Sequence, residues 1–243
     1  MNMKYLPLYV LLLLTGAAVY AVNLPPVPAA PVNNDLISLE KKEESKTSFV
    51  EKQLIYRQIY NMAFDNISMI VDDNKLKSKT WAAVFSYRAL VSEATHVFGQ
   101  PITESAISGA KDLSCNIEGL GGRVIIISNY SEESMGLSQL AQLRATESEL
   151  KAMKFCYSSL IVPNTPDATN KNPRFTAVTS GDYESVITTV KLPPLKIIAY
   201  FGTKFEDFPN FKANIADKIS PDSSEFDPFG YNYFLLPDFQ LSK

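Results

Sequence analysis

The stretch Arg123-Val124-Ile125-Ile126-Ile127-Ser128 decides the fold, because it is a run of β-branched residues with no polar residue between its ends. A strand that is buried on one face alternates apolar and polar residues, whereas a strand that is buried on both faces is apolar throughout. We therefore expect residues 123–128 to form a central strand of a sheet that other elements cover on both sides.

Two long helices are predicted before this strand. Ser48 and Glu51 have the spacing of a capping box, in which each side chain satisfies a free backbone N–H of the first turn. Apolar residues then recur with helical periodicity to about residue 71. A second helix is predicted over residues 78–98, so that the two helices would form a hairpin. A third, short helix is predicted over residues 103–113.

The chain after the central strand is predicted to hold one helix, a loop and then mainly strands. The helix covers residues 131–156, and residues 163–173 are so rich in Pro and Asn that they predict a surface loop. The remaining elements are three short strands, a short helix and a last strand, over residues 174–179, 183–190, 195–201, 208–219 and 231–236. The expected fold class is α+β, with N-terminal helices, one buried strand and a helix, then a β-rich C-terminal part.

The first 21 residues have the pattern of a signal peptide. Lys4 is their only charged residue, an apolar run follows, and small residues end at Ala21, where cleavage is expected. The alternative is an uncleaved anchor, since this run is just long enough to span a membrane. In either case we expect export to the periplasm or the cell exterior, with membrane contact only through the signal segment if it is uncleaved.

Composition divides the rest of the chain into further segments. Residues 22–47 are rich in Pro and then in charged residues, which predicts an extended tether. A mainly helical part with a buried strand is expected over residues 48–162. After the loop at 163–173, a β-rich part with an aromatic C-terminal tail is expected over residues 174–243.

Cys115 and Cys156 are predicted to form a structural disulfide. They are the two cysteines of the chain, and an oxidising compartment favours closure of such a pair. The alternative is two separate buried thiols, because free cysteine is among the most buried residue types. The sequence has no Cys-x-x-Cys motif, which argues against disulfide exchange as its chemistry.

Charge and motif content argue against several classes of function. The 23 Lys and Arg against 26 Asp and Glu leave a net charge of −3, which is unsuited to nucleic acid. The glycine segment 119–122 precedes a strand, whereas phosphate-binding glycine loops follow one, so no nucleotide is expected. His96 is the single histidine and is expected at a helix end. We assign no catalytic residue, metal ion or cofactor.

A secreted carboxylate-dependent hydrolase is the enzymatic alternative. Glycoside hydrolysis needs only two acids at a fixed separation, and such a pair leaves little trace in a sequence. Acids in turns are more often simply solvated surface groups. The candidate acids are Asp72, Asp73, Glu206, Asp207, Asp222, Glu225 and Asp227. A released protein that binds a surface or host ligand is a further alternative.

The C-terminal region is dense in aromatic residues, which dominate the energetics of protein interfaces. The alternative is that these rings fill the core. The predicted partner interface consists of Phe226, Phe229, Tyr231, Tyr233, Phe234 and Phe239. The tether, the tail and the missing catalytic motifs together predict a non-enzymatic exported protein. It would be a structural subunit or adaptor of a cell-envelope assembly such as a secretion machine, and its partners would be other envelope proteins.

Overall fold

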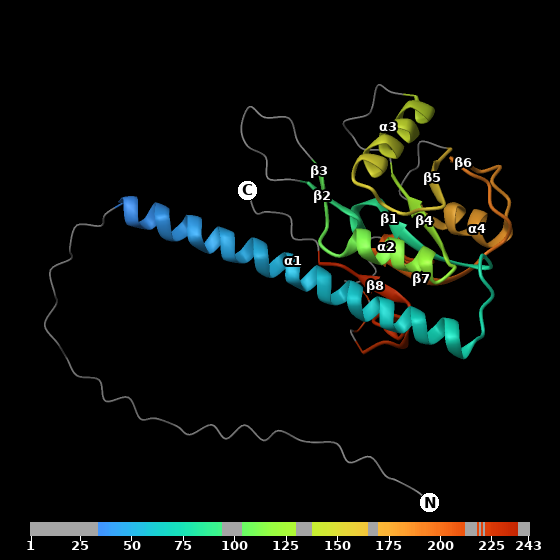
Figure 1. Ribbon diagram of the computed structural model, residues 1–243, viewed down its shortest axis with the longest axis horizontal. Helices are drawn as coiled ribbons and strands as arrows, with labels where there is room; N and C mark the ends of the chain where they lie inside the picture. Colours follow the sequence, from blue (N-terminus) through green and yellow to red (C-terminus); the bar gives the residue numbers. More distant parts are fainter. Residues whose placement is uncertain are drawn as a thin grey trace, which may run out of the picture. The chain divides into compact units, whose positions relative to one another are not determined.

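The computed structural model describes residues 34–93, 104–129, 138–164, 170–211, 218, 220 and 222–237, with side chains from residue 50 onward. The chain comprises two compact units, Met1–Lys42 and Glu43–Lys243. Of the first unit, the structure describes the beginning of helix α1. The second unit holds the folded body of the protein, which Figure 1 shows with its helices and strands labelled.

A six-stranded sheet forms the centre of the second unit, in the order β6-β5-β4-β1-β7-β8. Strands β5, β4, β1, β7 and β8 run parallel, and β6 is antiparallel to β5. A separate antiparallel ribbon of β2 (Val91–Glu93) and β3 (Glu104–Ala106) follows β1 in sequence. The strands of the main sheet are β1 (Trp81–Ser86), β4 (Arg123–Ile127), β5 (Ser159–Pro163), β6 (Val186–Thr188), β7 (Lys196–Gly202) and β8 (Tyr233–Leu235).

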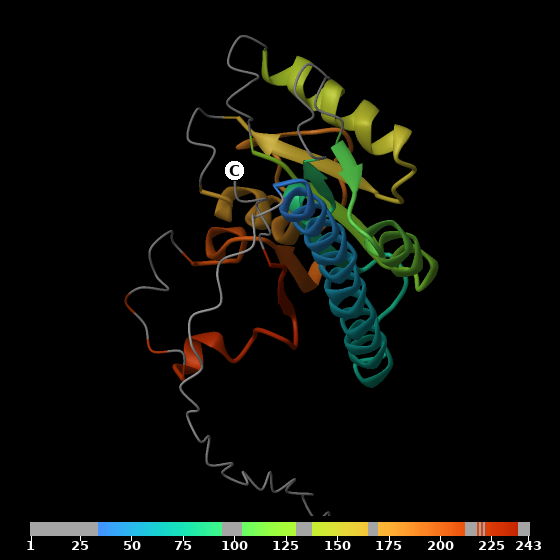
Figure 2. The ribbon, with the colours of Figure 1, turned by 90° about the vertical axis from the view of Figure 1, so that its left-hand side faces the viewer.

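Helices cover both faces of the sheet. The α-helices are α1 (Asn34–Asp73), α2 (Ala110–Gly119), α3 (Gln139–Ala152) and α4 (Asn172–Ser180). The core on one face is built with side chains of α1, α2 and α3, and the core on the other face with side chains of α4 (Figure 2). Successive side chains of a strand point to opposite faces, so Trp81 and Phe85 of β1 join the first core and Val84 joins the second.

The predicted fold class and its central strand are confirmed. Helices and a mixed sheet share one fold, and β4 occupies the stretch that was expected to be buried on both faces. From Val124 to Ile127 every residue of β4 is at most 1% exposed. The predicted end of the first helix near residue 71 and the predicted strands over 195–201 and 231–236 also match α1, β7 and β8.

The prediction of a second helix over residues 78–98 is wrong, and with it the helical hairpin. This region holds β1 and the 3₁₀ turn η1 (Tyr87–Ala89). All six residues of β1 are buried, because the strand is covered on both faces and paired on both edges. A short run that is apolar at every position has no period, so it cannot be told from part of a buried helix by pattern alone.

The prediction of a strand over residues 174–179 is also wrong, because these residues lie in α4. Their β-branched composition favoured a strand, but the local signals of a helix prevail. Pro173 lies in the first turn, where its missing N–H costs nothing, and Gly181 ends the helix in a left-handed conformation at φ 74°. Strand β5 has no counterpart among the predicted elements.

Several other boundaries differ from the prediction. Helix α1 begins at Asn34 and not at Ser48, so helix extends into the segment that was expected to be a tether. The helix expected over 103–113 is replaced by β3 and the start of α2. The signal segment, His96 and residues 212–217 of the helix expected over 208–219 lie outside the described residues. Within the described part of the chain, no helix has both the length and the apolar character that a membrane span requires.

The predicted disulfide between Cys115 and Cys156 is confirmed. Its Cα atoms are 4.8 Å apart, and it joins α2 to the segment between α3 and β5. Beside it, the backbone N–H of Cys156 donates to Ser114 Oγ at 3.3 Å. The disulfide and this hydrogen bond together fix α2 against the segment that leads into β5.

Replacing both cysteines by serine is expected to lower the free energy of unfolding. The disulfide closes a loop with a sequence separation of 41 residues, which corresponds to about 4 kcal/mol on the chain-entropy model. Urea unfolding of the double variant and of the oxidised wild type measures the difference. Equal midpoints and equal slopes would contradict a stabilising role for the bond.

Candidate functional site

The carboxyl ends of β4, β1 and β7 meet at one edge of the sheet, because the three strands are adjacent and parallel. From β1 the chain continues to β4 and β5 on one side and later returns to β7 on the other. In open α/β sheets, ligands bind outside the carboxyl ends of the strands, where the strand order reverses. This edge is therefore the place to look for a site.

Ser86 is the last residue of β1 and lies at this edge. It follows Ala82 and Val84 on the face that α4 covers, since the side chains of a strand alternate. The residue is only 4% exposed, although it is polar. A hydroxyl group is thus held at the end of β1, between the ends of β4 and β7.

Lys171 directly precedes α4 and brings an amino group to the same place. Its Nζ lies 3.3 Å from Ser86 Oγ, and the residue is 5% exposed. Lysine is almost never fully buried unless it is paired. The pair here is with Asp207, whose Oδ1 contacts the same Nζ.

Asp207 ends the 3₁₀ turn η3 (Phe205–Asp207), which follows β7. Its second carboxylate oxygen, Oδ2, accepts hydrogen bonds from the backbone N–H of Thr203 at 2.8 Å and of Lys204 at 3.2 Å. Gly202 makes this approach possible, because a Cβ atom on it would lie only 2.3 Å from Asp207 Cβ. The carboxylate is therefore fixed by its own loop and faces Lys171.

Ser86, Lys171 and Asp207 form a buried row in which a hydroxyl contacts an amino group and the amino group contacts a carboxylate. We call these three residues the polar triad. A hydroxyl beside a base that a third group orients is the arrangement that activates a nucleophile. Chemically, the triad can move a proton between Ser86 Oγ and Lys171 Nζ while Asp207 holds the amino group in place.

The environment of Lys171 makes proton transfer feasible near neutral pH. Burial lowers the pKa of Lys171 to about 7, and the nearby charge of Arg174 adds to this effect. Glu206 raises the pKa and Lys204 lowers it further. The contact with the Asp207 carboxylate favours the charged form and so acts against the burial.

Arg174 holds the carboxyl end of β4 beside the triad. This residue is 1% exposed, and its Nη1 donates to the carbonyl oxygen of Ser128 at 3.2 Å. Its Nη2 donates to Asn129 Oδ1 at 3.1 Å and to the carbonyl oxygen of Asn170 at 3.4 Å. The guanidinium therefore joins α4 to the end of β4 and adds a second buried positive charge at this edge.

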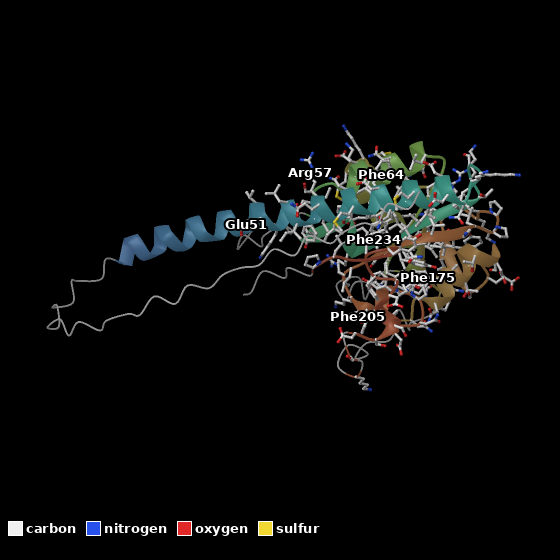
Figure 3. The ribbon with its side chains drawn as sticks, turned by 90° about the horizontal axis from the view of Figure 1, so that it is seen from below. Glu51, Arg57, Phe64, Phe175, Phe205 and Phe234 are labelled. Atoms are coloured by element: carbon white, nitrogen blue, oxygen red, sulfur yellow. A yellow bond between two sulfur atoms is a disulfide. The ribbon has the colours of Figure 1, made fainter. Side chains whose placement is uncertain are left out.

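A cluster of aromatic rings supports the loop that carries Asp207. Phe205 and Phe208 flank Asp207 in sequence, and both rings contact Phe229 at centroid distances of 5.6 and 4.9 Å. Each such pair contributes about 0.5–1.5 kcal/mol beyond the area that it buries. Figure 3 shows Phe205 and Phe175 on the side of the sheet opposite α1. The cluster consists of Phe205, Phe208, Phe211, Phe226, Phe229 and Tyr233.

The residues of the predicted partner interface are divided between this cluster, the core and the surface. Phe226, Phe229 and Tyr233 belong to the cluster, and Phe234 stacks on Phe201 in the core. Tyr231 is 53% exposed. Phe239 lies outside the described residues. A partner contact at these positions stays a prediction. The rings of the cluster and of Phe234 have contacts within the chain, so they also contribute to the fold.

Of the seven acids considered as catalytic candidates, the structure brings one, Asp207, into the buried site. Asp72, Asp73, Asp222, Glu225 and Asp227 are exposed, and Glu206 is half-buried. Among the described residues, no group of three or more His, Cys, Asp or Glu side chains is arranged to hold a metal ion. The site is thus not a pair of carboxylates, as glycoside hydrolysis would need.

Sequence reasoning missed Ser86, Lys171 and Arg174 as site residues. Ser86 was placed inside a predicted helix, and Lys171 in a predicted loop. The available signal was a polar residue directly after an apolar run, at Ser86 and again at Ser128. Had both runs been identified as parallel strands, their carboxyl ends would have predicted one shared edge.

Comparisons with known proteins give relatives in structure but not in sequence. No protein family matches the sequence, and no curated protein is significantly similar to it. Among solved structures, the class C acid phosphatase from Bacillus anthracis matches with a TM-score of 0.54 and 17% identity, over 77% of this chain and 78% of that chain. The class C acid phosphatase from Bacillus anthracis with tungstate bound matches with a TM-score of 0.53 and 18% identity, also over 77% of this chain and 78% of that chain. At these identities, the likeness shows a shared fold.

These neighbours correct the prediction of a non-enzymatic subunit or adaptor of a cell-envelope assembly. The two solved structures named above are hydrolases, which favours the enzymatic alternative. The prediction failed because it rested on missing motifs. The polar triad is assembled from three segments that are far apart in sequence, so no local motif marks it.

The close contact between Gly202 and Asp207 gives a test of the geometry of the loop. Gly202→Ala is expected to force η3 away from β7 and to destabilise the fold by about 1–3 kcal/mol. Gly119→Ala is the control, because no atom lies within 4 Å of a Cβ atom there. Thermal unfolding of both variants measures the difference, and a Gly202 variant as stable as the control would disprove the steric argument.

The ion pair of the triad predicts non-additive effects of substitution. Lys171→Met leaves the Asp207 carboxylate buried without its cation, which should cost about 3 kcal/mol. Combining it with Asp207→Asn, which removes the unpaired charge, should cost less than the sum of the two single substitutions. A double-mutant cycle by urea unfolding measures this coupling. Additive costs would show that the coupling free energy of Lys171 and Asp207 is close to zero.

Proposed function

We propose that this protein is a hydrolase of phosphate monoesters, with its site at the carboxyl ends of β1, β4 and β7. The observation that carries the proposal is the contact of Lys171 Nζ with both Ser86 Oγ and the Asp207 carboxylate at this edge. Buried reactive groups with a perturbed pKa are typical of functional sites. The shared fold with acid phosphatases supports the same class of reaction.

The charges at this edge favour an anionic substrate. Among the described residues, the buried charged residues are Lys171, Arg174 and Asp207, so two cations face one carboxylate while the Lys171 amino group is protonated. A site that is kept from water strengthens such an attraction, because the local dielectric constant is low. One solved structure of the same fold has bound tungstate, a tetrahedral oxyanion similar in shape to phosphate.

The described residues have distinct parts in this proposal. Lys171 binds the phosphoryl group and accepts and donates the proton, and Asp207 orients Lys171. Arg174 fixes the end of β4 and contributes positive potential through its charge. Preorganised charge of this kind stabilises a transition state without a cost of reorganisation during the reaction.

We also propose that the protein acts outside the cytoplasm. The disulfide between Cys115 and Cys156 supports this location, since such bonds persist mainly in oxidising compartments. The apolar segment that ends in small residues at Ala21 supports it independently. Neither argument depends on the reaction that the site performs.

The direct test is phosphate release from p-nitrophenyl phosphate by the purified full chain. Wild-type protein should release nitrophenol and inorganic phosphate in equal amounts. Lys171→Met should reduce kcat/KM by about 100-fold or more, the usual effect of removing a positioned proton-transfer group. Lys196→Met is the matched control, because Lys196 is an exposed lysine at the start of β7, and it should leave the rate unchanged.

Two further measurements keep this test decisive if Lys171→Met is unstable. Circular dichroism shows whether the variant is folded at the assay temperature. Tungstate should inhibit the wild-type protein in competition with the substrate, as expected for an oxyanion in the same site. A folded wild-type chain that releases no phosphate from p-nitrophenyl phosphate or from a panel of sugar and nucleoside monophosphates would refute the proposal.

A further inference from the structure

The position of Ser86 in the triad raises the question of which atom attacks phosphorus. A phosphate monoester can be hydrolysed by direct attack of water or through a covalent intermediate on a side chain. A covalent route needs a nucleophile within hydrogen-bond reach of a base, and the base in turn needs a group that orients it. Ser86, Lys171 and Asp207 meet these requirements in that order.

The carboxylate of Asp207 is less well placed to be the nucleophile. One of its oxygens contacts Lys171 and the other accepts two backbone N–H bonds from its own loop. A carboxylate engaged on both oxygens would have to break these contacts before it could attack. Ser86 Oγ, in contrast, is at the end of β1 and already lies beside the amino group.

We infer that Ser86 is the nucleophile of the proposed phosphatase reaction, with Lys171 as its base and with a phosphoserine as the covalent intermediate. The inference rests on the proposed function and goes one step further, since it names the attacking atom. It assigns Asp207 as a positioning residue that holds Lys171 and stabilises the ammonium ion that forms.

The first step transfers the phosphoryl group to the protein. Ser86 Oγ attacks phosphorus, so the Oγ–P bond forms and the bond from phosphorus to the ester oxygen breaks. The Oγ proton passes to Lys171 Nζ, and the ammonium then gives it to the departing oxygen. The products of this step are the free alcohol and phosphoserine at position 86.

The second step returns the protein to its starting state. A water molecule attacks phosphorus and loses a proton to Lys171 Nζ. The Oγ–P bond breaks, Ser86 Oγ recovers the proton, and inorganic phosphate leaves. The two steps together consume one ester and one water and yield one alcohol and one phosphate, with no oxidant, reductant or further reactant.

The charged groups around Lys171 determine how the attack depends on pH. They are Asp207, Glu206 and Lys204 from the η3 segment and Arg174 from α4. Burial and the charges of Arg174 and Lys204, opposed by that of Glu206, lower the pKa of the amino group to about 7. Only the neutral amine can accept the Ser86 proton, so the rate of attack should rise as pH increases through this value and then level off.

The experiment is a search for phosphoserine in the full chain. Wild-type protein is mixed with p-nitrophenyl phosphate, quenched in acid within one turnover, digested and mapped by mass spectrometry. We expect one phosphoryl group on the peptide that contains Ser86. Ser86→Ala should lose the label and at least 100-fold of the rate, whereas Ser68→Ala, which removes a hydroxyl bonded to its own helix α1, should change neither.

Substitution of Lys171 separates its role as a base from its charge. Lys171→Arg keeps a positive charge but cannot give up its proton near neutral pH. It should therefore slow phosphorylation of Ser86 by at least 100-fold and abolish the rise in rate with pH. A variant that retains the wild-type pH profile would overturn the assignment of Lys171 as the base.

The outcomes distinguish this inference from the proposed function. A label on Ser86 without phosphate release supports the nucleophile and refutes hydrolysis. Phosphate release with no label on Ser86, and with an undiminished rate in Ser86→Ala, refutes the nucleophile and retains hydrolysis. If the folded wild-type chain gives neither a label nor phosphate, both are wrong. The wild-type mapping decides the question even if the Ser86 variant does not fold.

Discussion

The burial of β1 on both faces and both edges is the constraint on which the rest of the structure depends. A strand in this position must be apolar along its length, and the helices of both layers must pack on it. Its end is the first place where a polar side chain can point away from the core. Ser86 occupies that place. Lys171, which comes after β5 in sequence, contacts its hydroxyl, and Asp207, which comes after β7, contacts Lys171.

The polar triad is costly to build, since two charged groups are removed from water. The surrounding structure offsets this cost with good geometry. The loop of Asp207 donates two backbone N–H groups to one carboxylate oxygen, Gly202 allows the close approach, and the aromatic rings around η3 hold the loop against β8. A buried ion pair of this kind is weak evidence for a contribution to stability and better evidence for a functional site.

The sequence allowed a reliable prediction where one signal dominates. The β-branched run at 123–128 and the helical periodicity up to residue 71 were sufficient for β4 and the end of α1, and the cysteine count was sufficient for the disulfide. Prediction failed where burial removes the period, as in β1, or where end signals outweigh composition, as in α4. Of the polar triad, only Asp207 was among the sequence candidates, because the three residues meet only through the parallel arrangement of strands that are distant in sequence.

The order of strands in the sheet also determines the order in which the chain can fold. Strand β1 pairs with β4, which comes soon after it, and with β7, which emerges only after β4, β5 and β6. Until β7 docks, one edge of β1 has no partner, and such an edge invites pairing with another chain. Closing this long loop is slow on entropic grounds. Asp207 follows β7 in sequence, so a chain in which β7 has not docked has no assembled triad.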